Sequence, residues 1–124
     1  MKKRVLNPER LRKVPPQFSW IDHRLVQENY FVRCEHCAWA LYLFLASVGD
    51  AEGLSYYSDA SLMRRLKMDQ VQLCSSRRQL IETGLIAYEK PLYQVLSLEA
   101  VSATPRSGVL SVAEVLRKVM GGQP

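Results

Sequence analysis

From Glu35 to Val48, apolar side chains recur at the three- and four-residue spacing of an α-helix, and they cover most of its circumference. A helix of this kind is stable in water only when other parts of the chain surround it. The turn-forming stretch 49–53 follows and ends the helix. The sequence therefore predicts one small domain built around a buried central helix.

The composition is that of a globular chain from a reducing compartment. Of the 124 residues, 48% are hydrophobic and 23% are charged, which is enough for one core and excludes intrinsic disorder. The three cysteines form no evident disulfide framework. The basic start lacks the apolar stretch of a signal peptide, and the longest apolar run is about half of a membrane span. We therefore expect a cytoplasmic protein.

The segments that follow the central helix alternate in a regular order. A short aromatic strand is expected at 54–57. Ser58 is a good N-cap for a helix that reaches Leu66, and Asp69 can cap a further helix to about Thr83. The spacing predicts two helices joined by a turn of about three residues.

A β-hairpin is expected after this helix pair. Gly84 supplies the residue that ends the second helix, and the segments 85–89 and 92–98 read as two strands around Lys90-Pro91. The fold class predicted from the sequence is mainly α with a small β-hairpin.

Two stretches carry a family resemblance, Ser58-Asp59-Ala60-Ser61-Leu62 with Leu66-Lys67-Met68-Asp69, and Leu80-Ile81-Glu82-Thr83-Gly84-Leu85-Ile86. In order and spacing they resemble the winged helix-turn-helix family of DNA-binding domains, of bacterial type. The resemblance implies a three-helix core with a short wing, in which the helix pair is held together by Ala60, Leu62, Leu66 and Met68. It implies double-stranded DNA as the partner, most simply for a transcriptional regulator, and a homodimer that matches symmetric half-sites.

The positive charge gathers in two places. Residues 1–14 carry six basic side chains against one acidic side chain, a net charge of +5, and residues 58–90 carry a net charge of +2. A basic segment beside a basic motif is typical of proteins that bind a polyanion. We expect a basic N-terminal arm over 1–17 and the winged domain over 18–98, then a linker over 99–110 and an amphipathic helix with a tail over 111–124.

The second helix of the pair is the expected recognition helix. A helical wheel places Leu73, Cys74, Leu80 and Ile81 inward. The residues expected to read bases are polar or small and lie elsewhere on the wheel: Gln70, Val71, Gln72, Ser75 and Ser76. The residues expected to contact phosphates surround them: Ser58, Arg64, Arg65, Lys67, Arg78 and Lys90.

Arg77 departs from this pattern, because it falls within the inward arc where the family usually has a leucine. Two explanations are open. Either the helix is rotated relative to the wheel, or the Arg77 side chain reaches out of the core or pairs with a carboxylate such as Asp59.

Other functions find less support. Cys34-Glu35-His36-Cys37, with His23 upstream, invites a metal or redox site, but a structural zinc site takes two such pairs or a histidine pair at defined spacing. No catalytic arrangement or phosphate loop is present at useful spacing. We expect no enzyme activity, cofactor, metal, membrane contact or small-molecule substrate. The alternatives are a winged helix that binds protein, and a replication or mobile-element accessory protein.

Overall fold

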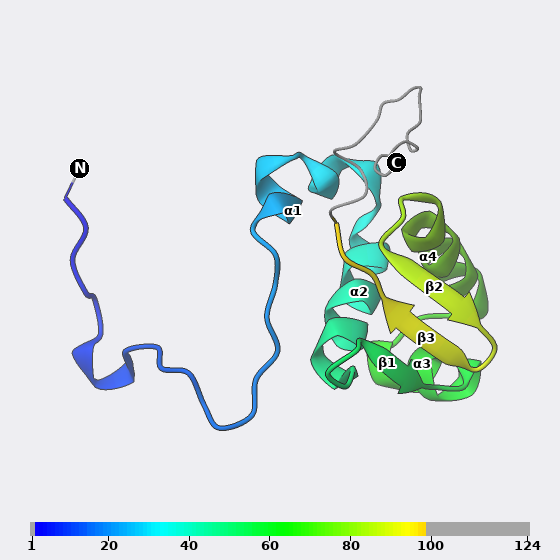
Figure 1. Ribbon diagram of the computed structural model, residues 1–124, viewed down its shortest axis with the longest axis horizontal. Coiled ribbons are helices and arrows are strands. Elements are labelled where there is room, and N and C mark those ends of the chain that lie inside the picture. Colours follow the sequence, from blue (N-terminus) through cyan, green and yellow to red (C-terminus); the bar gives the residue numbers. More distant parts are fainter. Residues whose placement is uncertain (1, 99–124) are drawn as a thin grey trace, which may run out of the picture.

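In the computed structural model, which describes residues 2–98, a bundle of helices lies behind a three-stranded antiparallel sheet (Figure 1). The elements in chain order are the 3₁₀ turn Pro8–Arg10, α1 (Arg24–Gln27), the 3₁₀ turn Tyr30–Arg33, α2 (His36–Val48), β1 (Leu54–Tyr56), α3 (Asp59–Leu66), α4 (Gln70–Glu82), β2 (Ile86–Glu89) and β3 (Leu92–Val95). We call residues 22–98 the body. The predicted linker 99–110 and the predicted C-terminal helix lie outside the described residues.

The central helix is confirmed as α2, with Ala38, Leu41, Tyr42 and Leu45 buried. It packs mainly against α4 and also against β3. The opposite side of α2 is not covered by the body, and 58% of the Leu43 side chain is exposed there. The apolar side chains of α2 therefore cover more of its circumference than the body buries.

The helix pair forms as the caps predict. The Ser58 hydroxyl accepts a hydrogen bond from the Ser61 N–H at 3.1 Å and begins α3. Asp69 and Gln72 form a reciprocal capping box at the start of α4, at 2.8 and 3.0 Å. Lys67 adopts the left-handed conformation between the helices, and the buried Met68 closes the turn. Leu62 is fully buried and Leu66 half-buried, but Ala60 is exposed, so its expected place between the helices is wrong.

The sheet is larger than the predicted hairpin, because β1 joins it. The strand order is β1-β3-β2, and Ser55 lies opposite Tyr93 while Tyr88 lies opposite Tyr93 on the other side. Ile86 and Tyr93 point into the core, and their neighbours Ala87 and Gln94 are exposed, as alternation along a strand requires. Gly84, at φ +80°, makes the left-handed turn between α4 and the sheet.

The segment before α2 contributes less to the core than the sequence indicates. Leu25 and Tyr30 are fully buried. Five further large apolar residues of this segment, whose side chains would suit the core, are exposed: Trp20, Ile21, Val26, Phe31 and Val32. The reason is that residues 2–21 are all exposed and the segment 2–17 runs out from the body, while α1 and the following 3₁₀ turn are single turns that each bury one large side chain (Figure 1).

Candidate nucleic-acid interface

The outward side of α4 is the candidate surface for a duplex. Leu73, Ser76 and Leu80 are buried toward the core. Because successive residues of a helix are separated by about 100°, Val71 and Arg78 lie on the side opposite these three, and both are exposed. The exposed fraction of Val71 is 78%. The outward stripe of α4 therefore presents an apolar side chain in the first turn, a cation two turns further on, and the exposed carboxylate of Glu82 one turn after that.

The first-turn residues Gln70 and Val71 are where the sequence predicts them, exposed at the N-terminal end of α4. Gln72 is also exposed, but its Oε1 accepts the Asp69 N–H in the capping box. A paired hydrogen bond with adenine needs both the oxygen and the nitrogen of the amide. Gln72 could form that pair only if its Oε1 released the Asp69 N–H, whereas the Gln70 amide takes no part in the capping box.

The two serines expected to read bases do not both face outward. Ser76 is 1% exposed, so its expected base contact is wrong. Ser75 is half-buried, and its hydroxyl accepts a hydrogen bond from Gln79 Nε2 at 3.1 Å. Ile81, expected inside, is exposed. These differences together amount to a rotation of α4 by roughly 60° from the predicted wheel.

Arg77 fixes one flank of α4. Its Nη1 donates to Asp59 Oδ1 at 2.9 Å and to the Tyr93 hydroxyl at 2.7 Å. The guanidinium carbon also lies 4.4 Å from the centre of the Tyr88 ring. The expected pairing with Asp59 is confirmed, and this single side chain ties α4 to α3 and to the sheet.

The surroundings of Arg77 shift two pKa values. Burial works against the Arg77 charge, but the hydrogen bonds with Asp59 and Tyr93 outweigh it and raise the pKa of the guanidinium. Burial raises the pKa of Tyr93 to about 12, although the Arg77 hydrogen bond acts in the opposite direction. At neutral pH the cluster therefore holds a charged arginine and a neutral phenol.

The raised pKa of Tyr93 predicts a loss of stability in alkali. The unfolded chain releases the phenolic proton near pH 10, and the folded chain holds it to about pH 12. This contribution is therefore fully present below pH 10 and is lost as the pH rises to 12. We expect the free energy of unfolding to fall by about 2 kcal/mol across this window. Urea unfolding at a series of pH values measures it, and Tyr93→Phe should give a distinctly flatter profile; equal slopes in the two proteins would contradict the assignment.

Gln79 fixes the other flank of α4. Its Oε1 accepts the Glu35 N–H at 2.7 Å, and its Nε2 donates to Glu35 Oε1 at 3.3 Å. Next to it, Cys34 is buried with its Sγ 3.3 Å from Thr83 Oγ1. On the wheel Gln79 lies on the outward side, so sequence reasoning missed its role in joining α4 to the start of α2.

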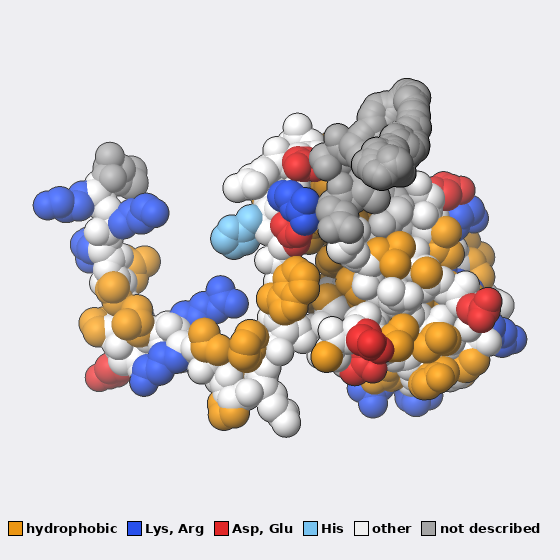
Figure 2. All heavy atoms as spheres, viewed as in Figure 1, with side chains coloured by type: hydrophobic (Ala, Val, Ile, Leu, Met, Phe, Trp, Pro, Cys, Tyr) orange, Lys and Arg blue, Asp and Glu red, His pale blue; other side chains and the backbone are white. Residues whose placement is uncertain are grey.

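The cations of the helix pair and the hairpin are exposed. Arg64, Lys67 and Arg78 are exposed on the helix pair, and Lys90 is exposed at the tip of the hairpin. Arg65 is exposed too, with its guanidinium carbon 5.9 Å from the ring centres of both Phe44 and Tyr57. Figure 2 shows Lys and Arg side chains gathered along the margin of the body below α3 and β1.

Two of the three acidic side chains of the helix pair, Asp59 and Asp69, are occupied. Asp59 is paired with Arg77, and the Asp69 carboxylate caps α4. The Ser58 hydroxyl is likewise engaged, since it caps α3, so a phosphate at this end would meet backbone N–H groups. Glu82, in the last turn of α4, is exposed on the same stripe as Val71 and Arg78, so the exposed charge along the stripe is positive at Arg78 and negative at its C-terminal end.

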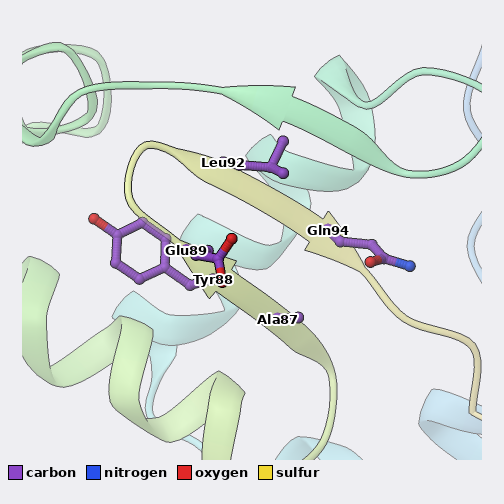
Figure 3. Close-up of a pocket in the computed structure, with 5 residues that line it drawn as sticks. All are labelled: Ala87, Tyr88, Glu89, Leu92 and Gln94. Atoms are coloured by element: carbon purple, nitrogen blue, oxygen red, sulfur yellow. The ribbon is translucent and has the colours of Figure 1, made fainter.

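A shallow hollow of about 250 Å³ lies on the sheet, lined by side chains of β2 and β3 (Figure 3). Its lining residues are Ala87, Tyr88, Glu89, Leu92 and Gln94. The one charged group among them is a carboxylate, which disfavours phosphate. Within residues 2–98, no group of three or more His, Cys, Asp or Glu side chains is arranged to hold a metal ion. The same residues include no helix with the length and apolarity needed to cross a membrane.

Comparison with protein-family models, with curated proteins and with solved structures gives no match. What the chain does must therefore be inferred from its own geometry.

Proposed function

We propose that the chain is a winged helix-turn-helix protein that binds double-stranded DNA, most simply as a transcriptional regulator. The order α2-β1-α3-α4-β2-β3, with β1 paired to β3, supports this topology. The single observation that carries the DNA proposal is the exposed stripe of α4 from Val71 to Arg78, on a helix pair and hairpin whose cations are also exposed.

The dimensions suit a major groove. An α-helix with its side chains is about 10–12 Å wide, and the major groove of B-DNA is about 12 Å wide. Gln70 can form a paired hydrogen bond with adenine, and Val71 can contact a thymine methyl group. Arg78 lies farther along the same stripe, where it can bind guanine or a phosphate. The base-reading set that we propose is therefore Gln70, Val71 and Arg78, with Gln72 and Ser75 at the margin.

The exposed cations would position the helix on the duplex. Arg64, Arg65 and Lys67 come from α3 and the turn, and Lys90 from the hairpin tip. Contacts of this kind go to the phosphate backbone and carry no sequence information, but they supply most of the salt-dependent affinity. The hairpin is short, so we assign it a phosphate contact and no insertion into the minor groove.

A salt series tests the proposal. We expect the affinity for a duplex to fall steeply with salt, and the slope of log K against log[salt] to decrease by about one for Arg64→Ala and about two when Arg65→Ala is added. Fluorescence anisotropy with a labelled duplex measures it. Arg33→Ala is a matched control, because Arg33 is exposed on the 3₁₀ turn before α2 and stacks on Tyr30, and it belongs neither to the α3–α4 pair nor to the hairpin.

The main competing function is a domain that binds another protein, and the exposed large apolar side chains outside α4 favour it. The same experiment separates the two functions. No detectable binding to any duplex at low salt would reject the DNA proposal and leave protein binding as the better explanation of this fold.

A further inference from the structure

The N-terminal arm, residues 2–17, presents apolar side chains that the body does not cover. Every residue from 2 to 21 is exposed. The large apolar side chains of the arm are Val5, Leu6, Leu11 and Val14, and Leu6 is 82% exposed. Figure 1 shows this segment running out from the body. A purely electrostatic tail for DNA would need the six basic residues of the arm and none of these apolar ones.

The outer side of α2 presents a second apolar surface, which the rest of residues 2–98 leaves uncovered. Leu43 and Ala40 are exposed on it. The base of the arm is anchored to the end of the same helix, because the Ser19 hydroxyl donates to the Ser47 carbonyl at 3.3 Å. Phe18 and Trp20, on either side of Ser19, are exposed as well. We call Phe18, Trp20, Ala40 and Leu43 the α2 strip.

The charges of these two surfaces are complementary. The segment 1–14 has a net charge of +5, whereas the segment 15–57, which contains the α2 strip, has a net charge of −3. Glu28 and Glu35 are exposed before α2, and Asp50 and Glu52 are exposed after it. Figure 2 shows acidic side chains on the body close to α1 and near β1. An arm that alternates cations with apolar side chains fits an apolar strip whose ends are acidic.

We propose that the arm of one copy docks on the α2 strip of a second copy, and that the exchange is reciprocal. Sixteen extended residues reach about 50 Å, whereas a body of this size is about 30 Å across, so the arm easily spans a neighbouring molecule. A symmetric exchange buries the same contact twice, which brings the total area toward the roughly 1,600 Å² of a stable interface. This dimer does not depend on DNA binding.

Sedimentation of the full chain without DNA tests the exchange. We expect a dimer, and we expect both deletion of residues 2–17 and Leu43→Glu to raise its dissociation constant by at least about 100-fold, because a carboxylate replaces an apolar contact in the second case. Neither change removes a buried side chain, so the far-ultraviolet circular dichroism spectrum of the folded body should stay the same, while the melting temperature should lose its dependence on protein concentration. Val71→Glu is the matched control on α4 and should leave the dimer intact.

Mixing the two defective chains distinguishes arm exchange from other dimers. The arm-deleted chain keeps an intact strip, and the Leu43→Glu chain keeps an intact arm, so we expect them to form a heterodimer that neither forms alone. Three results would overturn the proposal. They are a monomeric full chain at every concentration, a stable dimer of the arm-deleted chain, and no heterodimer at concentrations about 100-fold above the dissociation constant of the unmodified dimer.

Discussion

Replacement of Arg77 by methionine is expected to lower the free energy of unfolding by about 3 kcal/mol. Methionine keeps much of the length and apolar bulk of the side chain but removes both hydrogen bonds of Nη1. The Tyr93 hydroxyl then stays buried without this donor, and Asp59 loses its counter-ion. Because 34% of the Asp59 side chain is exposed, water recovers part of that loss, which places the cost at the lower end of the range for breaking a buried ion pair.

Urea unfolding of the purified variant measures this cost, and the neighbouring residue provides the control. Arg78→Met removes the same charge from an exposed position one residue away, so we expect a change within about 0.5 kcal/mol. A double-mutant cycle with Asp59→Ala should give a coupling energy of about 2 kcal/mol between Arg77 and Asp59. Equal effects of Arg77→Met and Arg78→Met would show that the Arg77 cluster does not hold α4 in place.

The starts of α3 and α4 and the end of α4 could be predicted because local signals determine them, whereas β3 ends at Val95 and not at the predicted residue 98. Ser58 and Asp69 are caps whose hydrogen bonds are made within three residues along the chain. Gly84 ends α4 because it adopts a positive φ that a side chain would resist. These interactions require no knowledge of the rest of the fold, and the structure confirms each of them.

The rotation of α4 could not be predicted in the same way, because distant segments determine it. A helical wheel ranks Cys74, Ser76 and Ile81 by polarity alone, and it places Ser76 outside. In the structure, Asp59 and Tyr93 hold Arg77 on one flank, and Glu35 holds Gln79 on the other. The sequence did contain one sign of this rotation, because Arg77 is a charged residue within the arc that the wheel predicts to be apolar.

The exposed apolar residues of the first third of the chain show a second limit of prediction from sequence. A sequence pattern indicates that Trp20 or Val32 is suited to burial, but it does not indicate whether the covering surface belongs to the same molecule. Likewise, the α2 pattern predicts a helix surrounded on all sides, and the body covers one side of it. The further surface is the one that the proposed arm exchange would supply.

Replacement of Val71 by glutamate is expected to lower the affinity for duplex DNA by about 100-fold. The substitution places a carboxylate on the outward stripe of α4, where the proposed complex brings it against the groove and its phosphates. Val71 is 78% exposed, so no core contact is lost. An acidic residue in the first turn also interacts favourably with the helix dipole, so the stability of α4 should be unchanged or slightly higher.

Val26→Glu is the matched control, because it changes the same residue type by the same charge at a comparable exposure, 64%, on α1. Both variants lower the net charge of the protein by one, so the general attraction between the protein and the polyanion changes equally in both. Anisotropy titrations at one fixed salt concentration should therefore give about a twofold loss at most for Val26→Glu, well short of the loss for Val71→Glu. If the two variants weaken binding to the same extent, net charge alone governs it, and α4 does not enter the groove.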